Sequence, residues 1–260
     1  MPRSLWTGAS GMIGQQSSVD VIANNIANVN TTGFKRQRVN FQDVFYDVQA
    51  MPGTQAGSLG RNPTGVQIGN GVVVSSTPRI FTQGNVEPTG KGTDVAIEGE
   101  GFFQATLPDG SLAYTRAGEF APDANGDIVT PDGYFLEPRI NIPDGATQVG
   151  VSTTGQVTGL VNGTETTFGQ LTLATFRNSA GLVSTGRNLF IESVGSGSPT
   201  VGNPGDTGYG TIRNGVLEKA NVEAVTELVN LIVAQRAFDM NSKSVKTSDE
   251  MLRTANELVR

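Results

Sequence analysis

The 260-residue chain has no cysteine and no histidine, which excludes cysteine-thiolate catalysis, histidine-dependent triads, zinc-finger sites and disulfide bonds. Its formal net charge is −6, and positions 41–216 hold 8 basic against 16 acidic residues, so no basic stripe suited to nucleic acid is present. The 34 glycines and 12 prolines are many for a globular protein, but too few for a collagen-like or disordered one.

The first part of the chain predicts a helix from Arg3 to about Val29. Its apolar positions recur every seven residues, at Leu5, Met12, Val19 and Ile26. Gly8, Gly11 and Gly14 fall near one face, and each costs about 1 kcal/mol of helix propensity relative to alanine. We therefore expect a helix that is poorly formed in the free monomer and orders when another backbone packs against its small residues.

The residues that follow this helix predict an irregular connection. Thr31-Thr32-Gly33 ends the helix, and Lys35, Arg36 and Arg38 are interpreted as a solvated basic face or as partners of acidic residues on a neighbouring subunit. The segment Tyr46–Pro63 is rich in glycine, proline and serine and has no clear period, which predicts an extended loop.

The middle of the chain, from Val66 to about Ile191, predicts an all-β domain. Short runs such as 72–74, 94–97, 101–104, 171–176 and 189–191 have the composition of strands. Five hairpin dipeptides separate such runs: Asp109-Gly110, Asn125-Gly126, Asp132-Gly133, Asp144-Gly145 and Asn162-Gly163. Their irregular spacing favours a sandwich or barrel over a repeat solenoid.

The last 44 residues, from Leu217 to Arg260, contain no glycine and no proline. An apolar or small residue recurs there at Leu217, Ala224, Leu231, Phe238, Val245, Leu252 and Val259. A seven-residue repeat at both ends of one chain predicts two long helices that pack on each other and on copies of themselves.

These elements predict an α+β, multidomain fold. Residues 1–34 and 217–260 form a discontinuous helical coiled-coil domain, residues 35–74 and 195–216 an extended connecting region, and residues 75–194 an inserted all-β domain, sandwich- or barrel-like. We expect that removing residues 1–34 and 217–260 leaves a soluble, folded, monomeric β domain.

Several short motifs suggest chemistry, but each is better explained structurally. The Asp123–Asp127 stretch begins like a calcium loop, yet Ile128 and Tyr134 stand where an EF-hand needs glycine and an acid, which favours a hairpin turn. Gly90-Lys91-Gly92-Thr93 lacks the spacing of a phosphate loop, and Gly99-Glu100-Gly101 lacks the third glycine of a dinucleotide site. We predict no catalytic, metal or cofactor site and no small-molecule substrate.

Four asparagines lie in the seven positions from Asn24 to Asn30. Asparagine is unfavourable within a helix, so the stretch is either a frayed, capped helix end or a set of carboxamides used in packing. We favour intersubunit hydrogen bonds from Asn24, Asn25 and Asn28, because the stretch resembles the N-terminal signature of a family of proteins that polymerise.

This stretch, continuing to Thr31-Thr32-Gly33-Phe34-Lys35, resembles the N-terminal signature of the bacterial flagellar rod and hook protein family. The segments 94–103, 114–118, 215–222 and 235–238 resemble the family's central and C-terminal motifs, with Ala220 and Phe238 where relatives more often have serine and tyrosine. The resemblance runs along the whole chain, and the segment Tyr46–Pro63 matches in place the insertion that distinguishes distal rod from hook.

The resemblance implies a structural subunit that is not an enzyme, has no cofactor and polymerises into the hollow distal rod, a drive shaft that spans the periplasm and transmits torque from motor to hook. It implies contacts with other copies of the chain, with proximal rod and hook subunits, with the outer-ring (bushing) proteins and with the flagellar type III export apparatus, and no binding of nucleic acid. The opening residues lack the apolar region of a cleaved signal, in keeping with export without one.

Under this interpretation we expect two sets of residues to work in assembly. The expected subunit-packing residues are Leu5, Met12, Val19, Asn24, Asn25, Ile26, Asn28, Leu231, Gln235, Phe238, Val245 and Leu252. The expected rod-stiffening segment contains Tyr46, Pro52, Gly53 and Pro63.

Two alternatives remain open at the level of sequence. The first is a hook or proximal rod subunit. The second is a carbohydrate-binding or hydrolytic β domain that uses acids such as Asp123, Asp127 or Glu98 and requires two converging carboxylates in a concave site.

Overall fold

The computed structural model describes residues 3–53, 55–56, 60–61 and 63–258, and it has an N-terminal and a C-terminal helix with a multi-stranded β region between them in the chain. Contacts divide the chain into two compact units. The helical unit comprises residues 1–26, 37–78 and 224–260, and the β unit comprises residues 27–36 and 79–223. Val259, the last position of the predicted repeat, lies outside the described residues.

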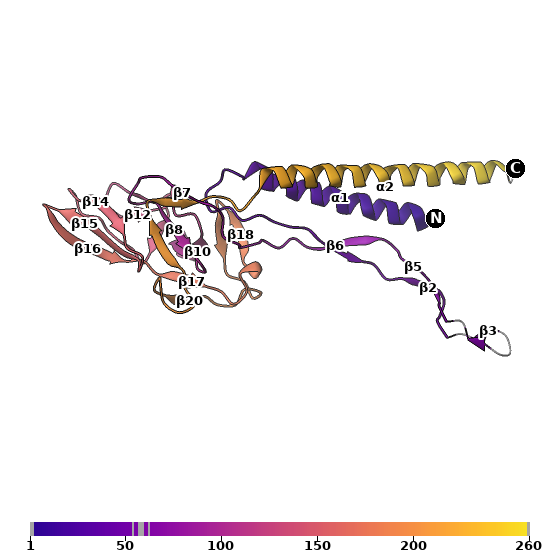
Figure 1. Cartoon of the computed structure of the whole chain (residues 1–260), viewed down its shortest axis with the longest axis horizontal. Helices are drawn as coiled ribbons and strands as arrows, with labels where there is room; N and C mark the ends of the chain where they lie inside the picture. The colour runs from indigo at the N-terminus through magenta and orange to yellow at the C-terminus, as the bar shows by residue number, and fades with distance from the viewer. Residues whose placement is uncertain (1–2, 54, 57–59, 62, 259–260) are drawn as a thin grey trace. The chain divides into compact units, whose positions relative to one another are not determined.

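Two long helices, α1 (Arg3–Ala27) and α2 (Ala224–Leu258), lie side by side in the helical unit (Figure 1). They run antiparallel, because Gly8 of α1 lies beside Val245 of α2, whereas Asn25 lies beside Glu227. Within the described residues, neither helix combines the length and hydropathy of a membrane span.

The helix expected to begin at Leu217 begins seven residues later. Residues 216–218 instead form strand β22 (Val216–Glu218), which pairs with β7 (Val86–Pro88). No glycine or proline marks this boundary, so only the pairing with a distant strand decides it.

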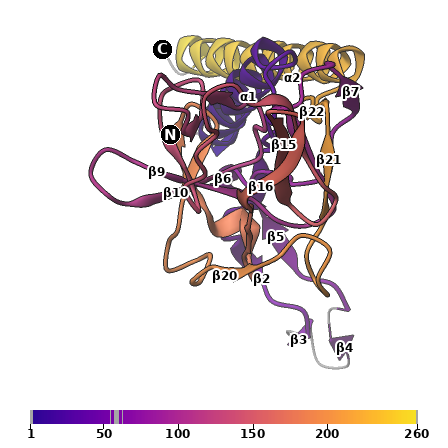
Figure 2. The same ribbon diagram turned by 90° about the vertical axis from the view of Figure 1, so that its left-hand side faces the viewer.

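Three strand pairs follow one another along a two-stranded arm that belongs to the helical unit (Figure 1, Figure 2). The strands are β1 (Asn40–Asp43), β2 (Asp47–Ala50), β3 (Gln55–Ala56), β4 (Gly60–Arg61), β5 (Val66–Ile68) and β6 (Val72–Ser76). They pair antiparallel as β1 with β6, β2 with β5 and β3 with β4. The prediction of a simple loop over Tyr46–Pro63 is therefore corrected for its described residues, because cross-strand pairing supplies the order that the composition does not indicate.

The β unit is built from antiparallel pairs. Its strands besides β7 and β22 are β8 (Val95–Glu98), β9 (Phe103–Thr106), β10 (Leu112–Thr115), β11 (Ala121–Pro122), β12 (Ile128–Val129), β13 (Phe135–Glu137), β14 (Thr147–Val151), β15 (Gln156–Val161), β16 (Thr164–Gln170), β17 (Leu173–Thr175), β18 (Val183–Gly186), β19 (Leu189–Ile191), β20 (Thr200–Gly202) and β21 (Thr211–Asn214). Seven of them form one sheet in the order β11-β12-β13-β9-β10-β19-β18, and β14-β15-β16 form a second.

The hairpin dipeptides lie at turns, as predicted. Asn162 and Gly163, between β15 and β16, have φ angles of 51° and 80°, the left-handed pair that a tight hairpin requires. The Asp123–Asp127 stretch is the turn between β11 and β12, and the Asp123 carboxylate accepts backbone hydrogen bonds from Asn125 (2.8 Å) and Asp127 (2.9 Å). Local turn chemistry explains this acidic motif.

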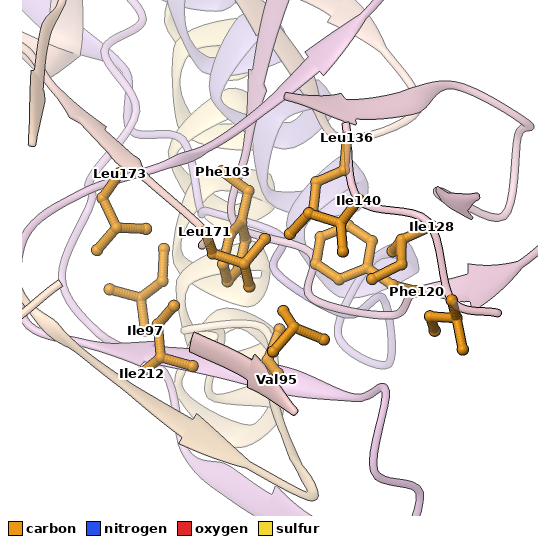
Figure 3. Close-up of a cluster of buried hydrophobic side chains, with 12 residues drawn as sticks. Val95, Ile97, Phe103, Phe120, Ile128, Leu136, Ile140, Leu171, Leu173 and Ile212 are labelled. Carbon is orange, nitrogen blue, oxygen red and sulfur yellow. The ribbon is translucent and has the colours of Figure 1, made fainter. Parts of the chain in front are cut away.

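One apolar cluster forms the main core of the β unit, as Figure 3 shows. Its buried members are Val95, Ile97, Phe103, Phe120, Ile128, Leu136, Ile140, Ile142, Val157, Leu171, Leu173 and Ile212. A second cluster contains Phe102, Tyr114 and Phe190, joined by edge-to-face contacts through Phe81 and Phe176. Together the clusters give this unit a closed interior.

The boundaries of the units differ from the expected ones. Residues 195–216 were expected to connect domains, but they contain β20, which pairs with β17, and β21, which pairs with β8. The β unit also includes residues 27–34 and 217–223, which come from the two segments expected to be helical, and residues 35–36 of the expected connecting region. A fragment limited to residues 35–216 would therefore lose parts of the β unit.

Candidate assembly surfaces

The contact between α1 and α2 is made largely by small residues. A Cβ atom built on Gly8 would lie 2.6 Å from Cγ2 of Val245, and one on Gly11 would lie 2.8 Å from Nδ2 of Asn241. Distances this short leave no room for a side chain, so glycine permits the close approach. Gly14 faces the arm instead, 3.1 Å from the Phe41 ring by the same construction. The expected small-residue face thus packs within the chain.

Polar residues occupy the centre of this helix pair. Glu227, Ala234 and Ser248 of α2 are buried, and together with half-buried Asn241 they recur every seven residues. The apolar repeat beside them is less covered: Leu231 and Val245 are half-buried, and Phe238 and Leu252 are about one-third exposed. A repeat of apolar residues does not reveal the buried stripe, because the stripe is mostly polar, although the same seven-residue spacing marks it.

Asn25 joins three parts of the helical unit. Its Nδ2 donates to the Gln37 carbonyl (2.9 Å) and to Oε2 of Glu227 (3.3 Å), and its Oδ1 accepts from the Gln37 backbone N–H (2.9 Å). The side chain is 1% exposed. Its carboxamide is therefore used inside the chain, which differs from the intersubunit role expected from sequence and follows from the return of residue 37 to the end of α1.

The remaining expected packing residues lie at varied depths. Leu5, Met12, Val19 and Ile26 are half-buried along α1. Asn24 is exposed, and half-buried Asn28 accepts a hydrogen bond from Thr31 Oγ1 (3.1 Å). Gln235 and Phe238 line a cavity of about 470 Å³ together with Gln16, Val19 and Asp239.

The outward face of α2 is apolar. The exposed large hydrophobic residues in its first half are Val225, Leu228, Val229, Ile232, Val233 and Met240. On α1, Trp6 and Ile13 lie seven residues apart and are 70% and 66% exposed. A helix pair that stands alone in water normally shows the reverse arrangement, with its apolar stripe turned inward.

The arm also exposes large hydrophobic side chains. Phe45 is 92% exposed, and Tyr46, Val48, Met51 and Val66 are exposed near it. Pro52 and Pro63 are exposed as well, and Gly53 has a φ of 83°. A two-stranded ribbon has no interior of its own, so these side chains remain in water unless a neighbour covers them.

The basic trio that follows α1 is divided by the fold. Lys35 is fully buried and bonded to Glu218, Arg36 is half-buried, and Arg38 is exposed with its Nε bonded to Oδ1 of Asn40 (3.1 Å). The interpretation of the trio as a solvated face is wrong for Lys35. Burial lowers the pKa of the Lys35 ammonium from its usual 10.5, and the neighbouring Glu218 carboxylate opposes that shift.

The acids proposed for a hydrolytic site have structural partners. Asp127 pairs with Arg139, whose hydrogen bond is the main cause of a lowered pKa for that carboxyl, and Glu98 pairs with Arg213 (2.8 Å). Asp123 caps its own turn, as described above. None of the three lines the 470 Å³ cavity or the cavity of about 260 Å³ beside Thr31, Thr115 and Arg187.

A helix pair made from both ends of the chain, a separate β unit inserted in the sequence between them, and exposed apolar surfaces are the features of a subunit built for assembly. Three family models match the chain: "Flagella basal body rod protein" over residues 5–35, "Flagellar hook protein FlgE/F/G D1 domain" over 96–159 and "Flagellar basal body rod FlgEFG protein C-terminal" over 213–258.

Similar proteins narrow the class. The flagellar basal-body rod protein FlgG of Borreliella burgdorferi is 46% identical over 264 residues, covering 100% of both chains, and that of Caulobacter vibrioides is 46% identical, covering 98% of this chain and 99% of its own. The flagellar hook protein FlgE of Helicobacter mustelae is 46% identical over 139 residues, which cover 53% of this chain and 30% of that protein. The chain belongs to the family of flagellar basal-body rod and hook proteins, and it is a structural subunit of the flagellar basal-body rod.

Proposed function

We propose that the chain polymerises into the distal rod as a helical homopolymer, and that the outward face of α2 is the main contact between copies. The observation that carries this proposal is the outward face of the helix pair: α2 exposes a run of large apolar residues and α1 exposes Trp6 and Ile13, whereas the polar residues Glu227 and Ser248 are buried. Burying such a surface contributes about 25 cal/mol per Å². A contact between two different faces of identical copies propagates into an open helical filament.

The proposal extends to partners and location. The rod would contact proximal rod subunits at one end and hook subunits at the other, and it would turn inside the outer rings. Each subunit would reach its site through the flagellar export apparatus, and the rod would span the periplasm. It would work as a structural element and not as an enzyme. The absence of cysteine and histidine from the sequence and the structural use of Asp123, Asp127 and Glu98 support this part of the proposal.

The arm would stiffen the polymer. Bending a tube requires its subunits to slide along the axis, and an arm seated on a neighbour opposes that sliding. Phe45 and Tyr46 supply the apolar contact area, and Pro52 and Pro63 restrict the chain, which reduces the entropy lost when the arm is ordered. A long arm of this kind favours rod over hook among the alternatives.

The α2 contact is tested by Ile232→Asp in the full-length chain. A carboxylate at the centre of the apolar face would be buried without a partner in the polymer, at a cost of several kcal/mol per subunit. We expect the monomer to keep its β-unit stability and to form no filaments in electron micrographs. Thr247→Asp, which adds the same charge at an exposed polar position of α2, is the control and should polymerise.

The single tryptophan gives a second readout, since Trp6 lies on the exposed face of α1. Its emission should shift to the blue when the wild type polymerises and should not shift in Ile232→Asp. Normal filaments from Ile232→Asp would reject the proposed contact.

The arm is tested by deleting Tyr46–Pro63. The deletion leaves α1 and α2 intact, so filaments should still form, but they should curve and have a shorter persistence length than the parent. Unchanged straightness would reject the stiffening role and would remove one reason to prefer rod over hook.

A further inference from the structure

Two segments of the β unit that are far apart in the chain, residues 27–36 and 218–221, meet at Glu218. We call residues 27–36 the N-terminal strap. Its Gly33 N–H donates to the Glu218 carbonyl (2.8 Å), its Arg36 N–H donates to Oδ1 of Asn221 (2.8 Å), and its Phe34 carbonyl accepts from the Asn221 N–H (3.4 Å). The strap is thus bonded along the segment 218–221, and its carbonyls also accept hydrogen bonds from Asn188 Nδ2 (at Thr32, 2.9 Å), Arg79 Nη1 (at Lys35, 3.0 Å) and the Ile80 N–H (at Arg36, 2.9 Å).

Lys35 attaches the strap through a buried charge. Its Nζ donates to Oε1 of Glu218 (2.6 Å) and to the Thr82 carbonyl (2.8 Å), and the Lys35 and Glu218 side chains are both 0% exposed. Oε1 of Glu218 also accepts the Gly84 N–H (2.8 Å). Because an unpaired buried charge is strongly unfavourable, loss of the strap would leave the Glu218 carboxylate without its ammonium partner.

A second buried cation faces the other oxygen of the same carboxylate. Nη1 of Arg116 lies 3.8 Å from Oε2 of Glu218, too far for a hydrogen bond, and Nη2 donates to the Gly99 carbonyl (2.6 Å). Among the described residues, neither Oε2 of Glu218 nor Nε of Arg116 has a hydrogen-bond partner. The guanidinium also lies over the Phe102 ring, 5.5 Å from its centroid. Nη1 already donates a long hydrogen bond to the Ile97 carbonyl (3.4 Å). Within the described part of the chain, the guanidinium thus keeps one unbonded nitrogen, Nε, and stands beside a carboxylate with one unbonded oxygen.

We propose that Arg116 is a reserve partner of Glu218, so that the strap and its Lys35 can leave the β unit without leaving a buried unpaired carboxylate. A movement of roughly 1 Å brings Nη1 within the ~2.8 Å of a charge-assisted hydrogen bond to Oε2. The β unit then has two stable states: in one the strap is docked and its Lys35 pairs with Glu218, and in the other the strap is released and Arg116 pairs with Glu218 instead. The strap follows directly after α1 in the chain. Under the proposed function, the strap could therefore dock while the subunit assembles, after the β unit has already folded.

A double-mutant cycle in the full-length monomer tests the reserve role. Lys35→Met alone should be tolerated, because Arg116 takes over, and Arg116→Met alone leaves the Lys35–Glu218 pair intact. The double variant should raise the unfolding equilibrium constant of the β unit about tenfold beyond the product of the two single effects. Adding Glu218→Gln, which removes the buried charge, should restore most of that loss.

A control double-mutant cycle combines Lys35→Met with Arg139→Met. Arg139 is another arginine of the β unit, and its partner is Asp127. The effects in this control cycle should multiply to within about twofold. If the Lys35–Arg116 cycle is equally additive, or if Lys35→Met alone prevents folding, Arg116 is not a reserve partner.

Hydrogen exchange of Lys35→Met gives an independent measurement. The Gly33 and Asn221 amides should exchange at least about tenfold faster, whereas the amides of β9 should keep their protection, because only the strap opens. Equal acceleration of the β9 amides would mean that Lys35 holds the whole unit, and would overturn the proposal. Both measurements use the monomer, so their outcome does not depend on whether the proposed α2 contact is correct.

Discussion

The two units treat hydrophobic side chains in opposite ways. The β unit encloses its aliphatic and aromatic residues in two clusters, and the exposed large hydrophobics described in it are Leu112, Val183, Val194 and Val201. In the helical unit, the fully buried hydrophobics described are Ile22 and Ala234, others such as Leu5, Val19 and Leu231 are half-buried, and α1, α2 and the arm expose many large ones. One unit is complete as a monomer, and the other has the composition of a core whose second half lies on another chain.

The charges follow the same division. The helical unit has eight basic and eight acidic residues, so the net charge of −6 belongs to the β unit. A neutral unit can be packed against copies of itself without long-range repulsion, whereas an acidic one favours solubility. The comparison predicts that substitutions in the β unit change monomer stability and that substitutions on the outer face of the helical unit change assembly.

The sharpest test of this difference compares two phenylalanines. Phe103→Ala should lower the free energy of unfolding of the β unit by about 3–5 kcal/mol, because it leaves a cavity in the main core. Phe45→Ala should change it by less than about 0.5 kcal/mol, since the ring is in water, yet should weaken polymerisation. Urea denaturation followed by circular dichroism measures the first effect and sedimentation the second. A stability loss above about 1 kcal/mol for Phe45→Ala would break the comparison.

A buried polar contact inside the helical unit should have the next largest effect. Asn25→Ala removes both hydrogen bonds to the Gln37 backbone in a buried position, and we expect a loss of about 1–3 kcal/mol. Faster hydrogen exchange at the Gln37 amide would report it. Asn230→Ala, an exposed asparagine of α2, is the matched control and should be neutral. Equal effects of the two substitutions would show that Asn25 does not hold the unit together.

The close approach of the helices predicts a smaller effect. Gly8→Ala gains up to about 1 kcal/mol of helix propensity, but its methyl group would overlap Cγ2 of Val245, and overpacking costs about 1–3 kcal/mol. We expect a net loss of about 1 kcal/mol, read from thermal melting at the helical band. Gly8→Ala with Val245→Ala should recover it. A single Gly8→Ala that stabilises the helices would contradict the observed packing.

The smallest expected effect is a change in how the stability of the β unit depends on acidic pH. The pKa of Asp127 is lowered from its usual 3.8 by its hydrogen bond from Arg139, so its contribution to β-unit stability is fully present above that pH and is lost as pH falls through the lower, folded pKa. Below pH 3.8, the free energy of unfolding of Asp127→Asn should therefore depend less on pH than that of the wild type. At neutral pH, the two free energies should differ only by a small constant amount. An identical acid dependence in the variant would assign that titration to other carboxyls.

Local sequence was sufficient for much of the architecture. The glycine-free tail and the seven-residue spacing of Leu5, Met12 and Val19 identified both helices, because helix propensity and periodicity act within a few residues. Asn162-Gly163 and three of the other dipeptides identified hairpins, because left-handed turns admit few residue types, whereas Asp144-Gly145 lies at a turn between β13 and β14, which pair with other strands. The family was also legible in contiguous motifs, and the comparisons confirm it.

Only the tertiary structure decided what depends on residues far apart in the chain. β22 was taken for helix because its partner, β7, lies more than a hundred residues away, and β2 of the arm was taken for loop for the same kind of reason, since its partner β5 follows beyond Pro63. The sequence also did not show which face of α2 is buried. A seven-residue repeat is the same whether its polar or its apolar stripe turns inward, and in the structure the buried stripe is the one with Glu227 and Ser248. Lys35 was interpreted as a surface cation because its partner, the buried carboxylate of Glu218, is 183 residues away along the chain. Propensity and turn chemistry are local and can be read in a sequence, whereas burial and charge pairing are properties of positions in space.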